Sequence, residues 1–299
     1  MKTVGITWWL ALAVLPASGF DLAKERPRIQ GEGITEASGL AVSPRDGRFL
    51  WIIDDSGAKP EIHLIQTDGT NRGAIRLKDV KNKDWEDLDS FTLDGKSYLL
   101  VADTGDNDYK RESVTLWILR EPDLPKTGAN LDGSVIPRSK IQFRFEDGPR
   151  DCESVAVDEK SGKIILISKR TKPPQVYELP LALNNKRGTL VARKIGNTQV
   201  KCPVASLIPF RNQPTGLDIS VDGSMAAAIT YYGVFLFSRK PAESWADAFS
   251  RQPTVLAAHH LPQAESVAIS KDGRSIFAVS EGKNSAIVRY QDATSAPPP

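Results

Sequence analysis

The sequence predicts an all-β protein, and more closely a β-propeller of five blades with four antiparallel strands in each blade. Three observations lead to this prediction: a short motif recurs five times, a strand–turn–strand pattern follows every copy, and the copies are spaced at the length of one blade. The copies occupy residues 36–40, 85–88, 152–155, 214–217 and 264–267. Self-similarity at a repeated interval is typical of propellers and other repeat architectures.

Each copy of the motif opens a predicted hairpin. The first strand is short and partly apolar, a turn containing Asp-Gly or Ser-Gly follows, and the second strand is more hydrophobic. In chain order the predicted first strands are 40–42, 88–93, 155–157, 217–219 and 267–269, and the second strands are 49–53, 98–101, 164–167, 225–229 and 276–279. A short Gly-containing turn between two β-rich segments is a strong hairpin signal.

The outer strands of the blades have weaker patterns. Third strands are predicted at 62–65, 115–119, 176–179, 234–237 and 287–290, and fourth strands at 141–145, 190–194 and 254–258. The chain after Glu265 is too short for a whole blade, so a strand near 28–30 is expected to complete the last one. A propeller of six blades is the alternative, if residues 181–209 contain a blade without the motif.

The chain divides into three segments. Residues 1–19 are predicted to be an export signal, because Lys2 precedes an apolar stretch and Ala17-Ser18-Gly19 is a small-residue cleavage site. Residues 20–293 form the single propeller domain, and the Pro-rich residues 294–299 form a disordered tail. The mature protein is therefore expected to be secreted or periplasmic, with no stable membrane insertion. An uncleaved N-terminal anchor is the alternative.

Charge and cysteine content narrow the classes of partner. The 39 basic and 37 acidic residues give a net charge of +2, so no nucleic-acid partner is expected. The two cysteines, Cys152 and Cys202, are candidates for a disulfide in an exported protein, with two buried thiols as the alternative. Neither cysteine lies at a spacing typical of zinc ligands.

The repeated motif aligns five residues that should meet at the propeller axis. They are Ser38, Glu86, Glu153, Thr215 and Glu265. Three carboxylates in one channel repel one another unless a cation compensates their charge, and Asp84 and Asp87 add to that charge. Calcium suits such a site, since it accepts six to eight oxygen ligands in flexible geometry. We therefore predict a calcium ion held by this column of five. In the alternative, the glutamates accept hydrogen bonds from backbone amides and water.

The ends of the second strands should share a mouth with this column, because the loop leaving each second strand returns to the same face. Of the residues there, six are predicted to bind a small-molecule or envelope ligand: Asp103, Asp106, Asn107, Tyr231, Tyr232 and Glu281. Asp54, Asp55, Lys169 and Arg170 are also strand-end residues. These four residues are candidates for catalysis. In the alternative, the side chains of the aspartates form a turn by bonding to the backbone, and the two cations lie at a solvated strand end.

The order of these residues resembles that of the calcium-activated nucleotidase (apyrase) family of five-bladed propellers, and more loosely that of secreted phytase-like propellers. The column is similar to the Ser-Glu-Glu-Ser-Glu column that holds the family's central calcium. Asp54-Asp55-Ser56-Gly57 is similar to its Asp-Asp-Arg-Thr-Gly segment, and Glu153-Ser154 with Lys169-Arg170 is similar to its Glu-Ser and paired-arginine segments.

Two segments depart from that family. Residues 102–107 replace its Gly-Gly-Leu-Gly-Lys-Glu-Trp segment, and residues 230–233 replace a stretch that contains lysine. The resemblance therefore implies the metal site and the scaffold more directly than it implies the contacts to a nucleotide.

Together these features predict an exported calcium-binding propeller that hydrolyses phosphate esters or anhydrides. In this hypothesis Asp54 or Asp55 orients a water molecule, Lys169 and Arg170 hold the phosphate, and calcium polarises a phosphoryl oxygen. Two alternatives stay open. One is a non-catalytic, calcium-stabilised propeller that binds a ligand or protein in the cell envelope, and the other is a lactonase-like hydrolase.

Overall fold

The computed structural model describes residues 19–183, 188–201 and 211–295. Within this part of the chain the structure is almost entirely β, with 21 strands, one helix of 6 residues, α1 (Trp245–Ser250), and a 3-10 turn at Ala293–Ser295. The predicted all-β class is confirmed. In the same part of the chain, no helix has the length and apolar character needed to cross a membrane.

The strands form five units of four, each beginning with a strand at the repeated motif. The first unit contains β2 (Ala37–Val42), β3 (Phe49–Asp54), β4 (Glu61–Gln66) and β5 (Asn71–Leu77), and the second contains β6 (Trp85–Leu93), β7 (Lys96–Asp103), β8 (Val114–Arg120) and β10 (Ser139–Phe145). The third contains β11 (Ser154–Asp158), β12 (Lys163–Ile167), β13 (Gln175–Pro180) and β14 (Leu190–Asn197), and the fourth contains β15 (Gly216–Ile219), β16 (Met225–Ile229), β17 (Val234–Ser238) and β18 (Thr254–Val255). The fifth contains β19 (Ala264–Ile269), β20 (Ser275–Ser280), β21 (Val288–Asp292) and β1 (Phe20–Leu22).

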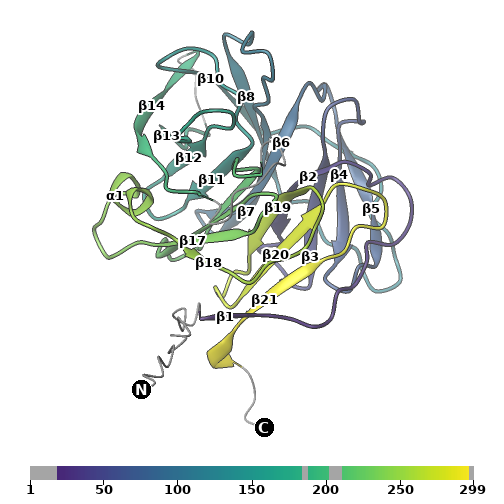
Figure 1. Ribbon diagram of the computed structural model, residues 1–299. Coiled ribbons are helices and arrows are strands. Elements are labelled where there is room, and N and C mark those ends of the chain that lie inside the picture. The colour runs from purple at the N-terminus through teal and green to yellow at the C-terminus, as the bar shows by residue number, and fades with distance from the viewer. Residues whose placement is uncertain (1–18, 184–187, 202–210, 296–299) are drawn as a thin grey trace, which may run out of the picture.

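The strand that completes the fifth unit lies earlier in the chain than predicted. Figure 1 shows the N-terminal strand β1 beside β21, and Phe20 is paired with Asp292 in an antiparallel ladder. Arg28, inside the predicted strand at 28–30, makes only an isolated bridge with Ala286. The prediction that an N-terminal strand closes the last unit is confirmed, whereas its position was wrong.

Two parallel pairings join strands at the outer edges. The short strand β9 (Ser134–Val135) extends the first unit beside β5. In the second and third units, β10 and β14 pair in parallel, with Phe143 opposite Leu190, so the two units form one sheet of eight strands. The two end strands of that sheet, β6 and β11, contact each other, which makes the sheet nearly closed and barrel-like.

The first strands of the five units are neighbours in a closed ring. Around the ring, β2 contacts β6, β6 contacts β11, β11 contacts β15, β15 contacts β19, and β19 contacts β2. Five hydrophobic clusters fill the spaces between consecutive units; one packs Trp51 of β3 against Trp85 of β6, and another packs Leu50 of β3 against Phe277 of β20. The apolar faces of adjacent sheets therefore cover each other around the whole ring.

Side chains hold the first strands together where no β-ladder does. Asp87 of β6 accepts hydrogen bonds from the backbone N–H groups of Val155 (2.8 Å) in β11 and Leu217 (3.1 Å) in β15. Asp218 of β15 accepts one from Ile269 of β19 (2.6 Å). These carboxylates supply acceptors to strand edges that would otherwise leave donors unpaired at the axis.

The serines complete the connection between the units. Ser266 of β19 donates to the Ala37 carbonyl of β2 (3.4 Å), and Ser38 of β2 donates to the Trp85 carbonyl of β6 (2.8 Å). With the aspartates, these bonds make a continuous set of side-chain links among the first strands.

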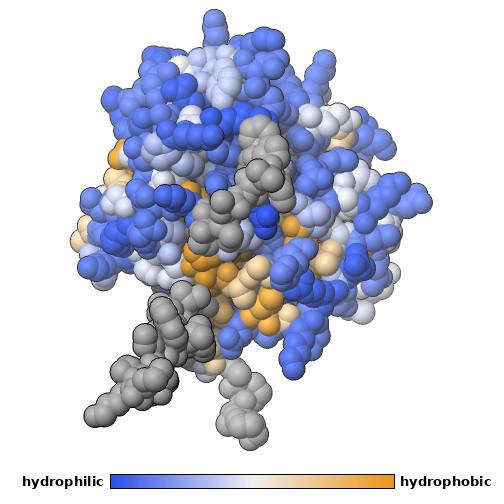
Figure 2. All heavy atoms as spheres, viewed as in Figure 1, coloured by the Kyte–Doolittle hydropathy of each residue, from blue (hydrophilic) through white to orange (hydrophobic). Residues whose placement is uncertain are grey.

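Several sequence predictions fall on residues that the structure does not describe. These are residues 1–18 of the predicted export signal, Cys202 of the predicted disulfide, part of the region 181–209, and residues 296–299 of the predicted tail. Cys152 is a fully buried free thiol that donates to the Ile167 carbonyl (3.4 Å). Within 181–209, the described residues 190–197 form the fourth strand of the third unit. The surface seen in Figure 2 is mostly hydrophilic, with a smaller apolar area below its centre.

His259 is buried as a neutral group beside the fourth unit. Its Nδ1 accepts a hydrogen bond from the Leu261 N–H (3.0 Å), which leaves Nε2 to donate to the Thr230 carbonyl (3.1 Å). Burial lowers the pKa of His259 to about 4. In the unfolded chain the pKa is about 6.5, so between these values the unfolded state binds a proton that the folded state does not. Folded-state stability therefore decreases as the pH falls through this range.

Replacing His259 is expected to remove part of the acid sensitivity of folding. In His259→Gln, the loss of unfolding free energy between pH 7 and pH 5 should be about 2 kcal/mol smaller than in the wild type, as measured by urea denaturation. His260→Gln, a change at the exposed neighbour, is the control and should keep the wild-type pH dependence. Equal pH dependence in His259→Gln and the wild type would contradict the assignment.

Candidate metal centre

The five column residues lie at one end of the ring of first strands. Ser38, Glu86 and Glu265 are in β2, β6 and β19, while Glu153 and Thr215 directly precede β11 and β15. All five side chains are buried. The structure therefore brings the predicted column to the same end of all five units.

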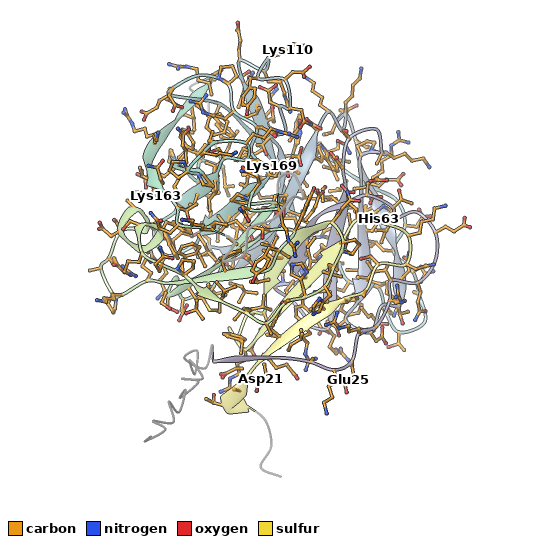
Figure 3. All side chains as sticks on the ribbon, in the orientation of Figure 1. Asp21, Glu25, His63, Lys110, Lys163 and Lys169 are labelled. Carbon is orange, nitrogen blue, oxygen red and sulfur yellow. The ribbon has the colours of Figure 1, made fainter. Side chains whose placement is uncertain are left out.

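Four of the five column residues have an internal partner. Thr215 Oγ1 donates to the Ala264 carbonyl (2.7 Å), as Ser38 donates to Trp85. The Tyr231 hydroxyl donates to Glu265 Oε1 (2.6 Å), and the Lys169 ammonium forms an ion pair with Glu153. Lys169 is labelled near the centre of the molecule in Figure 3.

Glu86 is the exception in the column. The residue is 4% exposed, and within the described residues its carboxylate has no hydrogen-bond or ion-pair partner. Burial and the nearby carboxylates of Glu153, Asp55 and Asp84 raise the pKa of Glu86 well above its usual value. An isolated buried carboxylate is strongly disfavoured in its charged form unless a positive charge compensates it.

Glu86 is shared by two groups of carboxylates that could hold a metal ion. One group contains Asp55, Asp84 and Glu86, and the other contains Glu86, Asp151 and Glu153. In each group, one oxygen from every residue lies within 4.8 Å of the others. A buried acidic cluster suitable for a cation is therefore present, and it contains two of the five predicted column residues, Glu86 and Glu153.

The pKa values in these groups reflect crowding of negative charge. Burial raises the pKa of Glu153 to about 8, with a contribution from Glu265 and opposition from Lys169. Burial, then the neighbouring Asp55, raises the pKa of Asp84 to about 6. Because a cation at either group would favour the ionised carboxylates, metal binding and deprotonation should be linked here.

Gly105, which follows β7, leaves room for the first of these groups. A Cβ atom at this position would lie 2.1 Å from Glu86 Oε1 and 2.4 Å from Asp84 Oδ2. The Gly105 N–H donates to the Asp84 carbonyl (3.2 Å), and the Gly105 carbonyl accepts from Arg111 (2.7 Å). This loop therefore lies directly against the two carboxylates, and glycine is the residue that fits.

The structure separates the two aspartates predicted to act in catalysis. Asp55 belongs to the first metal group. Asp54 is buried and belongs to neither metal group. Its Oδ1 accepts hydrogen bonds from the N–H groups of Thr35 (3.2 Å) and Glu36 (3.0 Å), and its Oδ2 lies 3.9 Å from His63 Nε2. Asp54 thus holds the loop before β2, which corresponds to its alternative role in the sequence.

The two predicted cations face carboxylates within the site. Lys169 pairs with Glu153, while Arg170 Nε donates to Asp151 Oδ2 (2.6 Å) and its terminal nitrogen donates to Asn107. The Arg170 backbone has φ +62°, in the left-handed region, and its N–H donates to Gln213 (2.6 Å). The chain is therefore turned locally so that both cations lie near the acidic groups.

The predicted ligand-binding residues are distributed around these contacts. Asp103 forms an ion pair with Arg111 (2.6 Å), and Asp106 accepts hydrogen bonds from the N–H groups of Lys110 (2.8 Å) and Arg111 (2.9 Å). Glu281 accepts from Gln263 Nε2 (2.6 Å); burial and Glu265 raise its pKa to about 8. Tyr232 lies under the Arg211 guanidinium, 5.5 Å from ring centre to carbon.

Asp151 is the main participant that the sequence prediction omitted. That prediction includes Asp84 only as additional charge. Both precede a column glutamate by two residues, so Asp-x-Glu occurs at 84–86 and again at 151–153. Comparing the residues two positions before the column, rather than the column alone, would have found both.

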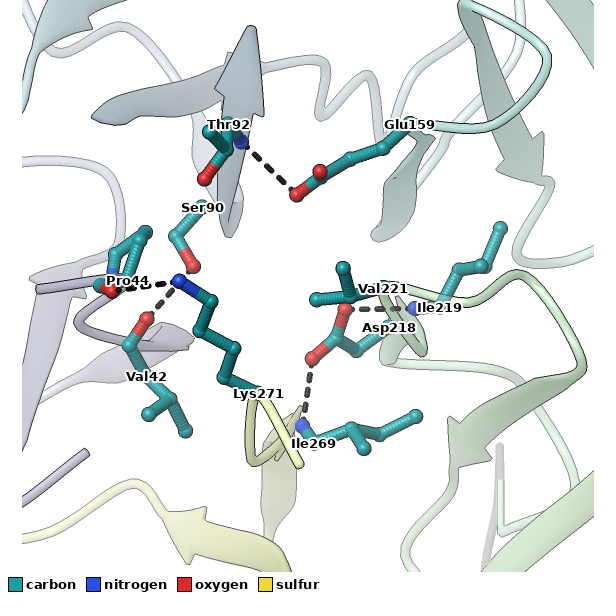
Figure 4. A pocket seen from close by; sticks show the side chains of 10 residues that line it. All are labelled: Val42, Pro44, Ser90, Thr92, Glu159, Asp218, Ile219, Val221, Ile269 and Lys271. Atoms are coloured by element: carbon teal, nitrogen blue, oxygen red, sulfur yellow. Dashed lines mark hydrogen bonds between the residues drawn. The ribbon is translucent and has the colours of Figure 1, made fainter. Parts of the chain in front are cut away.

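A second polar pocket lies at the opposite end of the first strands (Figure 4). Its lining includes Ser90, Glu159, Asp218 and Lys271. Glu159 accepts from the Thr92 N–H (2.9 Å), and Lys271 donates to the Pro44 carbonyl (3.4 Å). These polar groups contact protein partners, and the unpartnered carboxylate, Glu86, lies at the other end.

No family model matches this chain, and no curated protein matches it.

Proposed function

We propose that this protein is an exported five-bladed β-propeller that binds a calcium ion at the mouth defined by the column residues. The propeller interpretation is supported by the five four-stranded units, their ring of first strands and the hydrophobic cluster between every pair of neighbouring units. The proposal of export is supported by the signal-like sequence of residues 1–19.

The observation that carries the calcium proposal is the buried, unpartnered carboxylate of Glu86 between two acidic groups. Every candidate ligand is a carboxylate, and the described groups contain neither a histidine nor a cysteine ligand. Hard cations prefer such oxygen donors, and calcium tolerates an irregular arrangement better than magnesium does. The residues present therefore fit calcium, with Glu86 as the shared ligand.

Hydrolysis of a phosphate ester or anhydride is the reaction that we propose for this mouth. Bound calcium would supply a Lewis acid and a docking charge for a phosphoryl oxygen. Asp55 is half-buried at the metal group, where it could also orient a water molecule, and Lys169 and Arg170 provide two positive charges beside it. Binding a phosphate would require these cations to share their present carboxylate partners with the substrate.

A second candidate is a non-catalytic propeller in which calcium stabilises the mouth for an envelope ligand. It is favoured by one specific observation: the charged groups proposed for chemistry already have internal partners. Lys169 pairs with Glu153, Arg170 with Asp151, and Asp103 with Arg111. Such pairs rigidify a site without needing a substrate.

Calcium and chelator should distinguish these functions. We expect calcium to raise the thermal unfolding temperature of the mature protein, because a ligand specific for the folded state stabilises it by mass action. The increase should be lost in Glu86→Gln and kept in Glu32→Gln, a control at an exposed position. The absence of any calcium effect in the wild type would contradict the metal proposal.

The same preparations test the reaction. Calcium-dependent release of inorganic phosphate from a panel of nucleotides and sugar phosphates, lost in Glu86→Gln and Arg170→Ala, is expected for the hydrolase. Stabilisation by calcium without phosphate release would instead support the non-catalytic propeller.

A further inference from the structure

We propose that the calcium ion is held off the propeller axis by Asp55, Asp84 and Glu86, and that Lys169 and Arg170 neutralise the other carboxylates of the mouth. This inference rests on the proposed calcium function and specifies its site. It replaces the symmetric column of five with a site between the first and second units.

The distribution of partners separates the two acidic groups. On one side, Asp151 is paired with Arg170 and Glu153 with Lys169. Among the described residues, neither Asp55 nor Asp84 forms an ion pair; the carboxylate of Asp55 accepts only from the N–H of Ser56, its neighbour in the chain. The first group therefore carries three carboxylates without a paired cation, whereas the protein itself supplies cations to the second.

The column residues outside the first group have partners of their own. The hydroxyls of Ser38 and Thr215 donate their protons to backbone carbonyls of the next unit, and Glu265 accepts from Tyr231. A cation placed among all five would compete with Lys169 for Glu153. A cation in the first group breaks no ion pair among the described residues, since Lys169 and Arg111 act on its carboxylates only from beyond ion-pair distance. It also contacts Glu86, which has no other partner there.

The local backbone is shaped around the first group. Asp55 follows β3 of the first unit, whereas Asp84 directly precedes β6 of the second unit and Glu86 lies within it. Asn82 holds the two segments together, since its side-chain amide donates to the carbonyls of Asp54 (3.0 Å) and Asp55 (2.8 Å) and its oxygen accepts from the Trp85 N–H (3.1 Å). Gly105, in the loop after β7, closes the site without a side chain. A bound ion would thus connect two units that Asn82 already aligns.

Calcium titration by isothermal calorimetry tests this assignment on the mature protein, with calcium chloride as the probe. Asp55→Asn and Asp84→Asn should each weaken calcium binding by about tenfold or more, since each replaces a charged carboxylate ligand by a neutral amide in an ion site that has few protein ligands. Glu265→Gln and Glu153→Gln should change the dissociation constant by less than about threefold. Equal weakening by both pairs of variants, or weakening by the second pair alone, would overturn the off-axis site.

A variant that removes no charge provides the second measurement. Gly105→Ala places a methyl group against the carboxylates of Glu86 and Asp84 and should also weaken calcium binding by about tenfold. Gly47→Ala, where an added Cβ meets nothing within 4 Å, is its control. Normal calcium affinity in Gly105→Ala would count against the site. Failure of the wild type to bind calcium is a different result, because it would remove the proposed function itself.

Discussion

Asp87→Ala is expected to lower the free energy of unfolding by about 3 kcal/mol or more. Asp87 is fully buried, and its carboxylate accepts hydrogen bonds from the N–H groups of Leu88 (2.9 Å), Val155 (2.8 Å) and Leu217 (3.1 Å). Alanine would leave three buried donors without this acceptor. Each unpaired donor costs about 1–3 kcal/mol. Water that enters the space and accepts a hydrogen bond from a donor reduces this cost.

The effect should reach beyond one unit, because the three donors belong to β6, β11 and β15. Urea denaturation of the mature protein measures it, with Asp108→Ala as the control. Asp108 makes only an exposed pair with Lys110, so its replacement should leave stability unchanged. Similar unfolding midpoints for Asp87→Ala and the wild type would show that these bonds do not hold the axis together.

Asp87→Asn refines the test. The amide keeps the shape and one acceptor oxygen, but its NH₂ group must face at least one of the three donors. We expect stability between those of the wild type and Asp87→Ala. A ranking in which asparagine is worse than alanine would indicate that donor–donor repulsion exceeds the value of the remaining bonds.

The repeated hairpins were predictable from sequence because their signals are local. The turn at Asp94-Gly95 is an example: both residues have positive φ, as Asp-Gly favours, and the flanking segments form β6 and β7. The closing strand was harder, because its pairing partner is distant in sequence. Phe20 and Leu22 pack beside β21, which lies near the other end of the sequence. No local pattern within residues 20–30 shows that 20–22, rather than 28–30, forms the strand.

The site was predictable in its position but not in its internal pairing. Alignment of the motif located Glu86, Glu153 and Glu265 at one mouth, since equivalent positions of repeated units converge. Which carboxylate is left without a hydrogen-bond or ion-pair partner depends on the directions of the Lys169 and Tyr231 side chains. These residues lie in loops that follow other strands. The sequence repeat predicts which residues lie at the start of a strand, whereas the partner of a long side chain depends on tertiary packing.

Gly39→Ala is expected to destabilise the protein by about 3 kcal/mol, by forcing apart two strands of the ring. Gly39 lies in β2, where an added Cβ would be 2.4 Å from the Leu88 nitrogen, 2.7 Å from the Asp87 carbonyl carbon and 2.9 Å from Ile53 Cγ1. Two of these atoms are backbone of β6, so a side-chain rotation cannot relieve the overlap. Moving β6 would also disturb the bonds that Asp87 makes with β11 and β15.

Gly47→Ala separates this steric effect from the general effect of replacing glycine. Both positions lack a positive φ, and Gly47 has nothing within 4 Å of an added Cβ. The change at 47 should be neutral or slightly stabilising, because alanine restricts the unfolded chain. Thermal and urea unfolding of the two variants should therefore differ by the full cost of the overlap at position 39. If the two variants unfold together, the close approach of β2 and β6 is not a constraint on the ring, and the first strands have room to move apart at the end that carries Glu86.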